Sequence, residues 1–595
     1  MRVLVGEQVP FAFGIVGGKL APLIHAISQQ PSIRYVGVRH EAAGPMMAAA
    51  VHAGSGQMAV ALGEMGPGGL NLASGVGVAF NNNLPLLAIT TNQHRAAAYP
   101  HSGMFMDMDT KAVLAPLTKW NAVVNDGRRM PELVRRAFRE ALGGRPGPVH
   151  LDVPQDVLSA VCEFADDEFD LTPARYRATV GPRPAAETVT QAVALLRTAK
   201  RPLIVAGGGV VASGAAEAVR LLAVLLNAPV VPTQMALGVV PSSSPYFIGH
   251  GGIIAGQAIK TAFEEADVIL NVGCRYSSWM WDEMGPLARR HHRLININID
   301  ASSLGAPALH EVAIVADAGL ALADLLTALG AARPFAVEVD WLGRMRAVRA
   351  RYDAALAAMA HEPPNGDNDL QGDNLRDHDG QGAGSARRDG QDGKPMHPAA
   401  LAQAVAQALP ADAMAVYDGG HTTFWSNDFT PVYGVRTRFH EPGMSHLGFG
   451  LPYALALKLL HPDKAVINIT GDGSFGFTLQ ELDTARRSGL AVVTVIHNNA
   501  SWGIIQAGQR KQLDFEMGTA LDGTDYAAIS RGFGCFGESV THAQDVAPAM
   551  GRALASGLPA VLDCRTRFVP HPASPMFGSM NRYGFEALTR VEKNK

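Results

Sequence analysis

Two short apolar runs in the stretch 465–504 each end in polar residues that suit metal or phosphate chemistry. The first run ends in Gly471-Asp472-Gly473-Ser474 and the second in Asn498-Asn499. A helical pattern between the runs predicts a strand–helix–strand unit of a parallel sheet, in which ligands bind beyond the carboxyl ends of the strands. Asp472 offers an anionic oxygen, and Asn499, 27 residues later, a neutral one. Such oxygens suit Mg²⁺, which takes its remaining ligands from phosphate.

The glycines and the helix support the same site. Gly471 and Gly473 let backbone N–H groups approach a diphosphate, and a helix starting near Ser474 would point its positive end at it. The pattern places two sets of residues on opposite helix faces: Leu479, Leu482 and Ala485 on the apolar face, and Glu481, Arg486 and Arg487 on the polar one. A GDGS turn alone is typical of any strand-to-helix connection. Together with the interval and the asparagine pair, it predicts a metal–diphosphate site.

The motifs GDGSF, ELDTA and NNASWG resemble the thiamine diphosphate signature of the acetolactate synthase superfamily. That family also includes benzaldehyde lyase, 2-hydroxyacyl-CoA lyase and oxalyl-CoA decarboxylase. The resemblance implies that Asp472, Asn499 and the backbone carbonyl of Ser501 hold the Mg²⁺ that anchors the diphosphate. The turn Asp418-Gly419-Gly420-His421 follows another predicted strand and would help to hold the diphosphate, although His421 could equally be a strand-end surface residue.

Length and composition exclude several classes of protein. A chain of 595 residues suggests three or four domains at about 150 residues each. Its net charge of −4 gives no basic surface for nucleic acid or anionic lipid. Four scattered cysteines without a CxxC pair favour a reducing compartment. With no apolar run of 18 residues, a cytoplasmic protein is expected.

Strand and helix patterns alternate along most of the chain and predict an α/β fold of three doubly wound parallel-sheet domains. The expected domains are a pyrimidine-binding domain at 1–165, a Rossmann-like middle domain at 185–335 and a diphosphate-binding domain at 397–595. A polar linker rich in Gly, Asp and Asn occupies 361–396. In the family the middle domain carries FAD, a coenzyme A nucleotide or nothing. Its turn Gly207-Gly208-Gly209 leaves these possibilities open.

Thiamine diphosphate also needs a carboxylate at its aminopyrimidine ring, which promotes loss of the C2 proton, and an apolar support for its bent shape. Glu41, in Arg39-His40-Glu41, resembles the glutamate of the family's RHE motif, although a glutamate there could simply favour a helix start. In the family this glutamate reaches the cofactor of a neighbouring subunit, which implies a homodimer or homotetramer. Leu447, 25 residues before Asp472, lies in a segment that resembles the MGxGLPxA motif and is the candidate support.

The substrate side of the site departs from the family. Met106 replaces a glutamine that usually hydrogen-bonds the substrate, and a thioether cannot donate. Lys19 stands where benzaldehyde lyase has a histidine facing its substrate. It could hold a carboxylate or phosphate, or be solvated at a helix start. His101 and Ser102 are possible replacements for the missing donor.

The sequence therefore predicts a thiamine diphosphate- and Mg²⁺-dependent lyase or carboligase. Its substrate would be a 2-keto acid, a 2-hydroxy ketone or a 2-hydroxyacyl-CoA, as in the acetolactate synthase and benzaldehyde lyase branches. Two alternatives remain: a flavin-containing oxidase that also uses thiamine diphosphate, and a catalytically silent subunit that binds the cofactor. The tail after Cys564 is either a lid over the site or a surface tail.

Overall fold

The computed structural model describes residues 1–98, 101–169, 171–252, 255–276, 292–305, 309–330, 335–361 and 395–572. Most of the predicted linker, and the tail beyond residue 572, lie outside the described residues. The chain divides into two compact units. In the described parts of both units, no helix is both long and apolar enough to span a bilayer.

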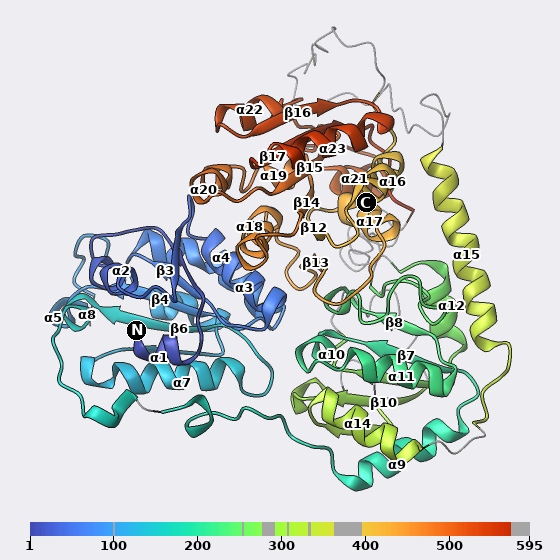
Figure 1. Cartoon of the computed structure of the whole chain (residues 1–595), viewed down its shortest axis with the longest axis horizontal. Helices are drawn as coiled ribbons and strands as arrows, with labels where there is room; N and C mark the ends of the chain where they lie inside the picture. Colours follow the sequence, from blue (N-terminus) through green and yellow to red (C-terminus); the bar gives the residue numbers. More distant parts are fainter. Residues whose placement is uncertain are drawn as a thin grey trace, which may run out of the picture. The chain divides into compact units, whose positions relative to one another are not determined.

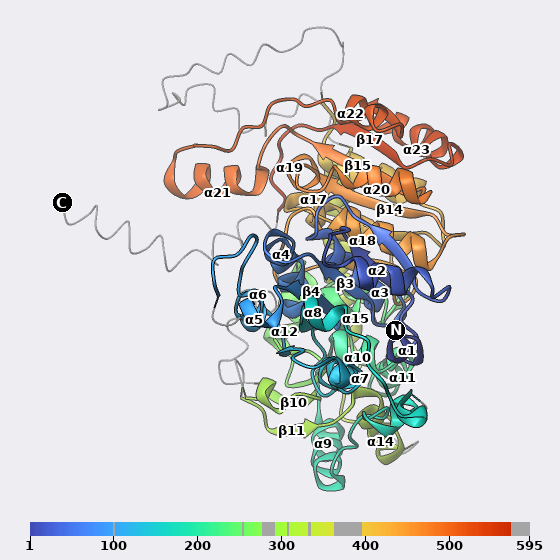
Figure 2. The same cartoon turned by 90° about the vertical axis from the view of Figure 1, so that its left-hand side faces the viewer.

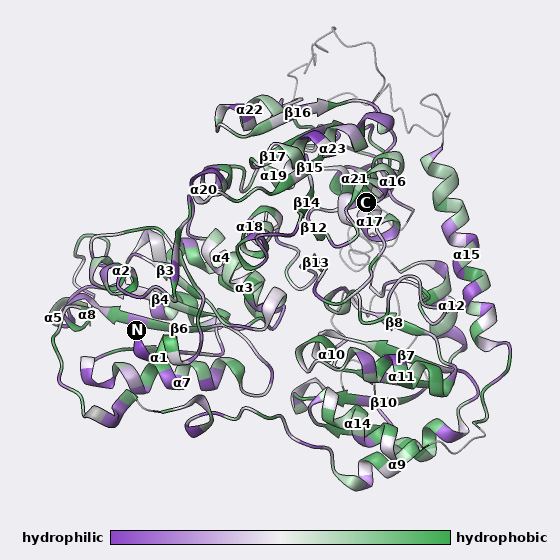
Figure 3. Cartoon of the chain, in the orientation of Figure 1, coloured by the Kyte–Doolittle hydropathy of each residue, from purple (hydrophilic) through white to green (hydrophobic). Residues whose placement is uncertain are grey.

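The first unit contains Met1–Gly181, Glu441–Val466 and Thr478–Val492. Its parallel sheet has the order β2-β1-β3-β4-β6-β5. The strands are β1 (Phe11–Gly14), β2 (Arg34–Gly37), β3 (Val60–Gly63), β4 (Leu87–Asn92), β5 (Trp120–Val123) and β6 (Val149–Pro154). The helices include α1 (Arg2–Gly6), α2 (Ala21–Ser28), α3 (Ala43–Ser55), α4 (Pro67–Asn81) and α7 (Met130–Leu142). Helix α7 alternates apolar and polar residues, and its apolar face joins the core beside β6 (Figure 3).

Two helices from the C-terminal third of the sequence pack in the first unit. Helix α18 (Gly450–Leu460) lies along α3, and α20 (Glu481–Ser488) contacts β2 (Figure 1). Gly54 permits the close approach of α3 and α18, because a Cβ there would lie 2.8 Å from the Leu457 side chain.

The second unit contains two further parallel sheets. The middle sheet has the order β11-β10-β9-β7-β8, and its central strands are fully buried. Its strands are β7 (Pro202–Ala206), β8 (Val230–Pro232), β9 (Val268–Val272), β10 (Arg293–Asn298) and β11 (Val312–Val315). The third sheet has the order β13-β12-β14-β15-β17-β16. Its strands are β12 (Met414–Tyr417), β13 (Arg438–His440), β14 (Val466–Gly471), β15 (Val493–Asn498), β16 (Phe536–Val540) and β17 (Ala560–Arg565).

The predicted α/β fold of parallel-sheet domains is confirmed. The helices that concern the site in the second unit are α17 (His421–Phe429), the single turn α19 (Asp472–Phe475) and α21 (Gly503–Leu513). Figure 2 shows β15 and β17 side by side, with α21 standing to one side of them.

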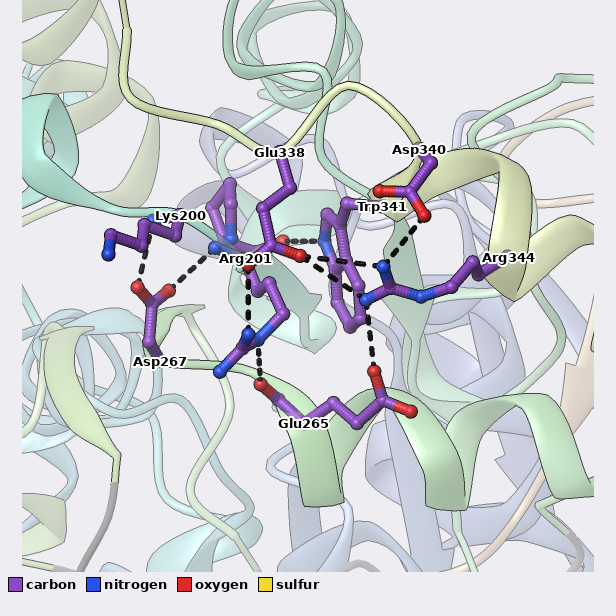
Figure 4. Close-up of polar contacts among 9 residues, drawn as sticks. Lys200, Arg201, Glu265, Asp267, Glu338, Asp340, Trp341 and Arg344 are labelled. Carbon is purple, nitrogen blue, oxygen red and sulfur yellow. Dashed lines mark hydrogen bonds and ion pairs between the residues drawn. The ribbon is translucent and has the colours of Figure 1, made fainter.

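Helix α15 (Trp341–Ala360) connects the middle sheet to the elements around the third sheet. At its start, the Trp341 indole donates to the carbonyl of Pro202 at 2.9 Å, and Arg344 pairs with Glu265, Glu338 and Asp340 (Figure 4). Further along, the Tyr352 hydroxyl donates to Asp428 on α17 at 2.6 Å. Contacts at the start and the middle of α15 therefore link α17 to the middle sheet.

Candidate functional site

Three neighbouring strands of the third sheet bring their carboxyl ends to one edge. Strands β12, β14 and β15 are adjacent and end at 417, 471 and 498. The Asp418 N–H donates to the carbonyl of Ile469 at 2.9 Å, so the turn after β12 lies against β14. Gly419 has a φ of +99°, and a Cβ there would lie 3.0 Å from Ser474 Oγ. The structure therefore brings the predicted residues 418–421 and 471–474 together.

Asp472 is buried at this edge with one carboxylate oxygen unsatisfied. The residue is 4% exposed; Oδ1 accepts the N–H of Gly473 at 2.9 Å, and Oδ2 is buried without a hydrogen-bond partner. Burial raises the pKa of Asp472 to about 6, although the backbone N–H groups of Gly473, Ala500 and Ser501 act in the opposite direction. The turn after β15 therefore faces Asp472. An unsatisfied buried acceptor costs about 1–3 kcal/mol, which a bound cation would offset.

Asn499 and Ser501 form that turn. Asn499 Oδ1 accepts the backbone N–H and the hydroxyl of Ser501, both at 3.1 Å. Ala500 has a φ of +52°, and its carbonyl accepts the N–H of Leu521 at 2.8 Å. Within the described ranges, no group of three His, Cys, Asp or Glu side chains is arranged to hold a metal. A cation at Asp472 would therefore take its other protein ligands from amide and carbonyl oxygens.

The predicted helix from Ser474 through Arg487 is interrupted, so that prediction is wrong. Helix α19 is one turn long, residues 476–480 form turns, and α20 begins at Glu481. Helix α17 starts at His421, directly after the Gly419 turn. Burial lowers the pKa of His421 to about 3, so its imidazole is neutral.

Two of the predicted cofactor-binding glycines also allow close packing by residues at α21. A Cβ on Gly473 would lie 2.5 Å from the Trp502 ring, and one on Gly420 would lie 2.9 Å from the Ile504 side chain. A Cβ on a third of these glycines, Gly471, would lie 3.3 Å from the hydroxyl oxygen of Thr422. The close approaches at Gly473 and Gly420 favour glycine whether or not a diphosphate is bound, whereas at Gly471 a small shift of Thr422 would make room for a Cβ.

Glu41 lies in the first unit, at the turn between β2 and α3. Its Oε2 accepts the side-chain N–H of Asn71 at 2.9 Å, and a Cβ on Gly68 would lie 3.3 Å from its Oε1. The carboxylate is therefore close to the first turn of α4, at the buried Gly68.

A second carboxylate, Glu481, fixes the turn that carries Glu41. It accepts the backbone N–H groups of Arg39 and His40 at 3.0–3.1 Å and the Thr484 hydroxyl at 2.6 Å. The residue is fully buried, so its predicted place on the polar helix face is wrong. Burial raises the pKa of Glu481. The helical pattern gave no sign of partners that lie about 440 residues away in the sequence.

Lys19 and Leu447 occupy turns of the first unit that are also fixed by polar contacts. The backbone N–H of Lys19 donates to Glu64 Oε2 at 3.0 Å, and Glu64 Oε1 accepts the Thr91 hydroxyl at 3.0 Å. Leu447 is half-buried, and its carbonyl lies 2.7 Å from His446 Nδ1. Sequence reasoning missed Glu64 because no local motif marks it.

Met106 and His101 share one loop. Met106 has a φ of +63°, a strained conformation for a residue with a side chain, and its carbonyl lies 2.8 Å from the position of a Cβ on Gly66. His101 Nδ1 lies 2.6 Å from Asp107 Oδ1. The His101–Asp107 pair thus bridges the loop across Met106.

The glycine-rich turn of the middle domain makes close backbone contacts. The N–H of Gly207 donates to the Val272 carbonyl at 2.8 Å, and that of Gly209 to the Gly273 carbonyl at 3.0 Å. A Cβ on Gly207 would overlap the carbonyl of Gly273. Packing of the turns after β7 and β9 accounts for these glycines.

Three family models match the chain. They are described as the N-terminal TPP binding domain, the central domain and the C-terminal TPP binding domain of thiamine pyrophosphate enzymes, and they match residues 1–113, 189–325 and 418–564.

Curated relatives cover most of the chain. It is 29% identical over 563 residues to the acetolactate synthase large subunit of Corynebacterium glutamicum, covering 93% of this chain and 83% of the relative. It is 28% identical over 541 residues to the acetolactate synthase isozyme 1 large subunit of Escherichia coli, covering 90% and 87%. With the three domain matches in chain order, the chain belongs to the thiamine diphosphate-dependent enzymes of the acetolactate synthase superfamily.

Proposed function

We propose that this enzyme is a Mg²⁺- and thiamine diphosphate-dependent lyase or carboligase acting on a 2-keto acid, a 2-hydroxy ketone or a 2-hydroxyacyl-CoA. The observation that carries the proposal is the buried Asp472 carboxylate, whose Oδ2 has no hydrogen-bond partner at the shared edge of three strands. The names of the relatives favour synthase-type chemistry over the flavin oxidase and the silent subunit. FAD or a coenzyme A nucleotide in the middle domain stays a prediction.

In this proposal the second unit holds the metal and the diphosphate. Mg²⁺ would be held by Asp472, by Asn499, whose Oδ1 now accepts from Ser501, and by the carbonyl of Ser501. Backbone and side-chain groups of the adjoining turns hold the diphosphate: Gly419, Gly420, His421, Gly471, Gly473 and Ser474. When bound, the cofactor supplies a nucleophilic carbon and an electron sink for the carbanion left by the departing group.

The first unit supplies the groups that act on the reacting end. Glu41, oriented by Asn71, holds a proton at the aminopyrimidine ring, and Leu447 supports the bent cofactor. Lys19, Met106 and His101 contact the substrate. The proposed domains are 1–165, 185–335 and 397–595, with a linker at 361–396.

We also propose that the enzyme is a cytoplasmic homodimer or homotetramer whose subunits share active sites. The relatives are named as large subunits, which accords with an oligomeric enzyme.

The decisive experiment replaces Glu41 by Gln. The variant should bind thiamine diphosphate and Mg²⁺ with nearly unchanged affinity but lose about a hundredfold or more in turnover, because the proton-holding carboxylate is gone. Turnover is measured with pyruvate, benzoylformate, benzoin, oxalyl-CoA and a 2-hydroxyacyl-CoA. Full activity in the variant removes Glu41 from the mechanism, and no turnover of any substrate by the wild type favours the silent subunit.

A further inference from the structure

The loop 441–448, which precedes α18, folds around a buried carboxylate. Glu441 is 1% exposed; its Oε1 accepts the N–H of Met444 at 2.7 Å and its Oε2 that of His446 at 2.9 Å. The side-chain amide of Asn82, at the end of α4, also donates to Oε1. A carboxylate is buried at such a position only when charge-assisted hydrogen bonds compensate its lost hydration.

The same loop is docked closely on the end of α4. The Gly443 N–H donates to Asn82 Oδ1 at 3.1 Å, and a Cβ on Gly443 would lie 2.6 Å from the Asn81 carbonyl. Asn82 in turn donates to the Val78 carbonyl at 2.8 Å. Glu441 and Asn82 therefore tie the loop to the helix whose first turn contacts Glu41.

The backbone of the loop is strained in the part that these contacts hold. Ser445 has a φ of +52°, and Gly448 a φ of +87°. The left-handed region is unfavourable for a residue with a Cβ, so Ser445 would leave it if the neighbouring N–H groups were released. The carboxylate of Glu441 binds the N–H groups on both sides of Ser445, at 444 and 446.

Leu447 lies between two anchors of this loop. On one side Glu441 holds the N–H of His446, and on the other the Thr478 hydroxyl donates to the Gly448 carbonyl at 2.7 Å. The Leu447 side chain itself remains only half-buried. The polar contacts thus fix the backbone around a side chain that the hydrophobic core does not fully enclose.

We infer that Glu441 is a positioning residue for the reaction, because its buried carboxylate holds Leu447 where it supports the bent cofactor. The inference rests on the proposed function of Leu447. Glu441 would act through the backbone of the loop, by way of the N–H groups of Met444 and His446.

The test measures exchange of the cofactor C2 proton with solvent deuterium in the holoenzymes of Glu441→Gln, Leu447→Ala and the double variant. In Glu441→Gln an amide NH₂ replaces one acceptor oxygen and opposes the N–H donors, so the loop shifts. We expect exchange to slow by about tenfold to a hundredfold, with cofactor affinity changed less than about threefold. The double variant should be no slower than Leu447→Ala alone, because both changes disturb one interaction. Glu338→Gln, which removes a carboxylate from the α15 network of Figure 4, should exchange at the wild-type rate.

Four results would overturn the inference or its basis, and they can be told apart. The role of Glu441 is overturned if Glu441→Gln exchanges the C2 proton at the wild-type rate. It is also overturned if the double variant is slowed by the product of the two single-variant factors. Wild-type exchange in Leu447→Ala instead overturns the proposed function of Leu447. If Glu441→Gln does not fold, the isosteric Thr478→Val removes the other anchor. We expect it to slow exchange with retained affinity, and an unchanged rate overturns the inference.

Discussion

Asp472, the proposed metal ligand, lies in an environment that disfavours its charge. Its Oδ2 is buried without a hydrogen-bond partner, and burial raises its pKa to about 6. Perturbed carboxyls of this kind concentrate at functional sites, where stability is given up for chemistry. Asp563, in the next strand but one, is also buried, and burial raises its pKa as well; but it accepts from Asn498 at 2.8 Å and from the Tyr526 N–H at 3.2 Å, and it pairs with Arg565 at 2.9 Å.

This contrast predicts opposite effects of two similar substitutions in the metal-free protein. The folded pKa of Asp472 lies above its ordinary value of 3.8, so the folded state binds more protons between 3.8 and about 6. Its contribution to the free energy of unfolding therefore falls as the pH rises through this window. Asp472→Asn should remove that dependence and stabilise the metal-free protein by roughly 1–2 kcal/mol near neutral pH.

Asp563→Asn should destabilise the protein, because it breaks hydrogen bonds that are already made. Urea denaturation at several pH values, in the presence of a chelator, measures both effects. If Asp472→Asn is destabilising to the same extent as Asp563→Asn, Asp472 is a structural residue and not a metal ligand.

At the residue scale, the sequence predicts Asp472 and Asn499 as candidate metal ligands because a fixed interval and two strand ends connect them. It did not reveal Glu64, Glu441 or Glu481. Each of these carboxylates binds backbone N–H groups or an amide far away in the sequence, with separations of 45, 359 and 442 residues. No local spacing encodes such contacts.

At the scale of elements, turns held by buried or half-buried carboxylates position the candidate residues of the first unit. The turn after β1 is an example. Glu64 Oε2 accepts the N–H groups of Lys19 and Leu20 at 3.0 and 3.3 Å. The carboxylate lies against Gly17, so that a Cβ on Gly17 would overlap it.

Gly17→Ala should therefore displace Glu64 and disturb the position of Lys19. We expect a loss of about 1–3 kcal/mol in the free energy of unfolding and a raised KM. Gly18→Ala is the matched control, because a Cβ on Gly18 has no atom within 4 Å. Urea denaturation and steady-state kinetics of both variants provide the comparison, and equal effects of the two substitutions would contradict the role of Glu64.

Elements were predictable where burial is complete. The apolar runs 202–206, 230–232 and 268–272 predict strands, and β7, β8 and β9 have these bounds, because each buried run is followed by glycine or threonine. Strands β5 and β11 were missed: β5 is partly exposed along its length, and β11 alternates between buried and exposed residues over only four positions. The helix expected from Ser474 is interrupted after one turn. The pattern of apolar residues could not predict this, because it does not show the turns at 476–480.

At the scale of the whole molecule, the candidate residues are divided between the two units. Glu41, Leu447, Lys19, Met106 and His101 belong to the first unit, and the Asp472 and Asn499 turns belong to the second. The proposed enzyme combines both sets at each cofactor, with Glu41 of one subunit serving the metal site of its neighbour.

This assembly predicts complementation between inactive chains. Co-expressed Glu41→Gln and Asp472→Ala chains should form hybrid dimers in which one site carries both changes and the other carries neither. Random pairing then restores roughly a quarter of the wild-type activity, because half of the dimers are hybrids with one intact site each. Separately purified variants give the baseline, and no recovery after co-purification of differently tagged chains would contradict a shared site.

The most direct test of the account is the calorimetric titration of thiamine diphosphate into the apoenzyme, with Mg²⁺ or with a chelator. The account predicts saturable binding to the wild type that requires Mg²⁺. It predicts that Asp472→Asn abolishes this binding, while Glu338→Gln leaves it unchanged. Binding without any divalent cation, or undiminished binding to Asp472→Asn, would contradict the proposed metal–diphosphate site.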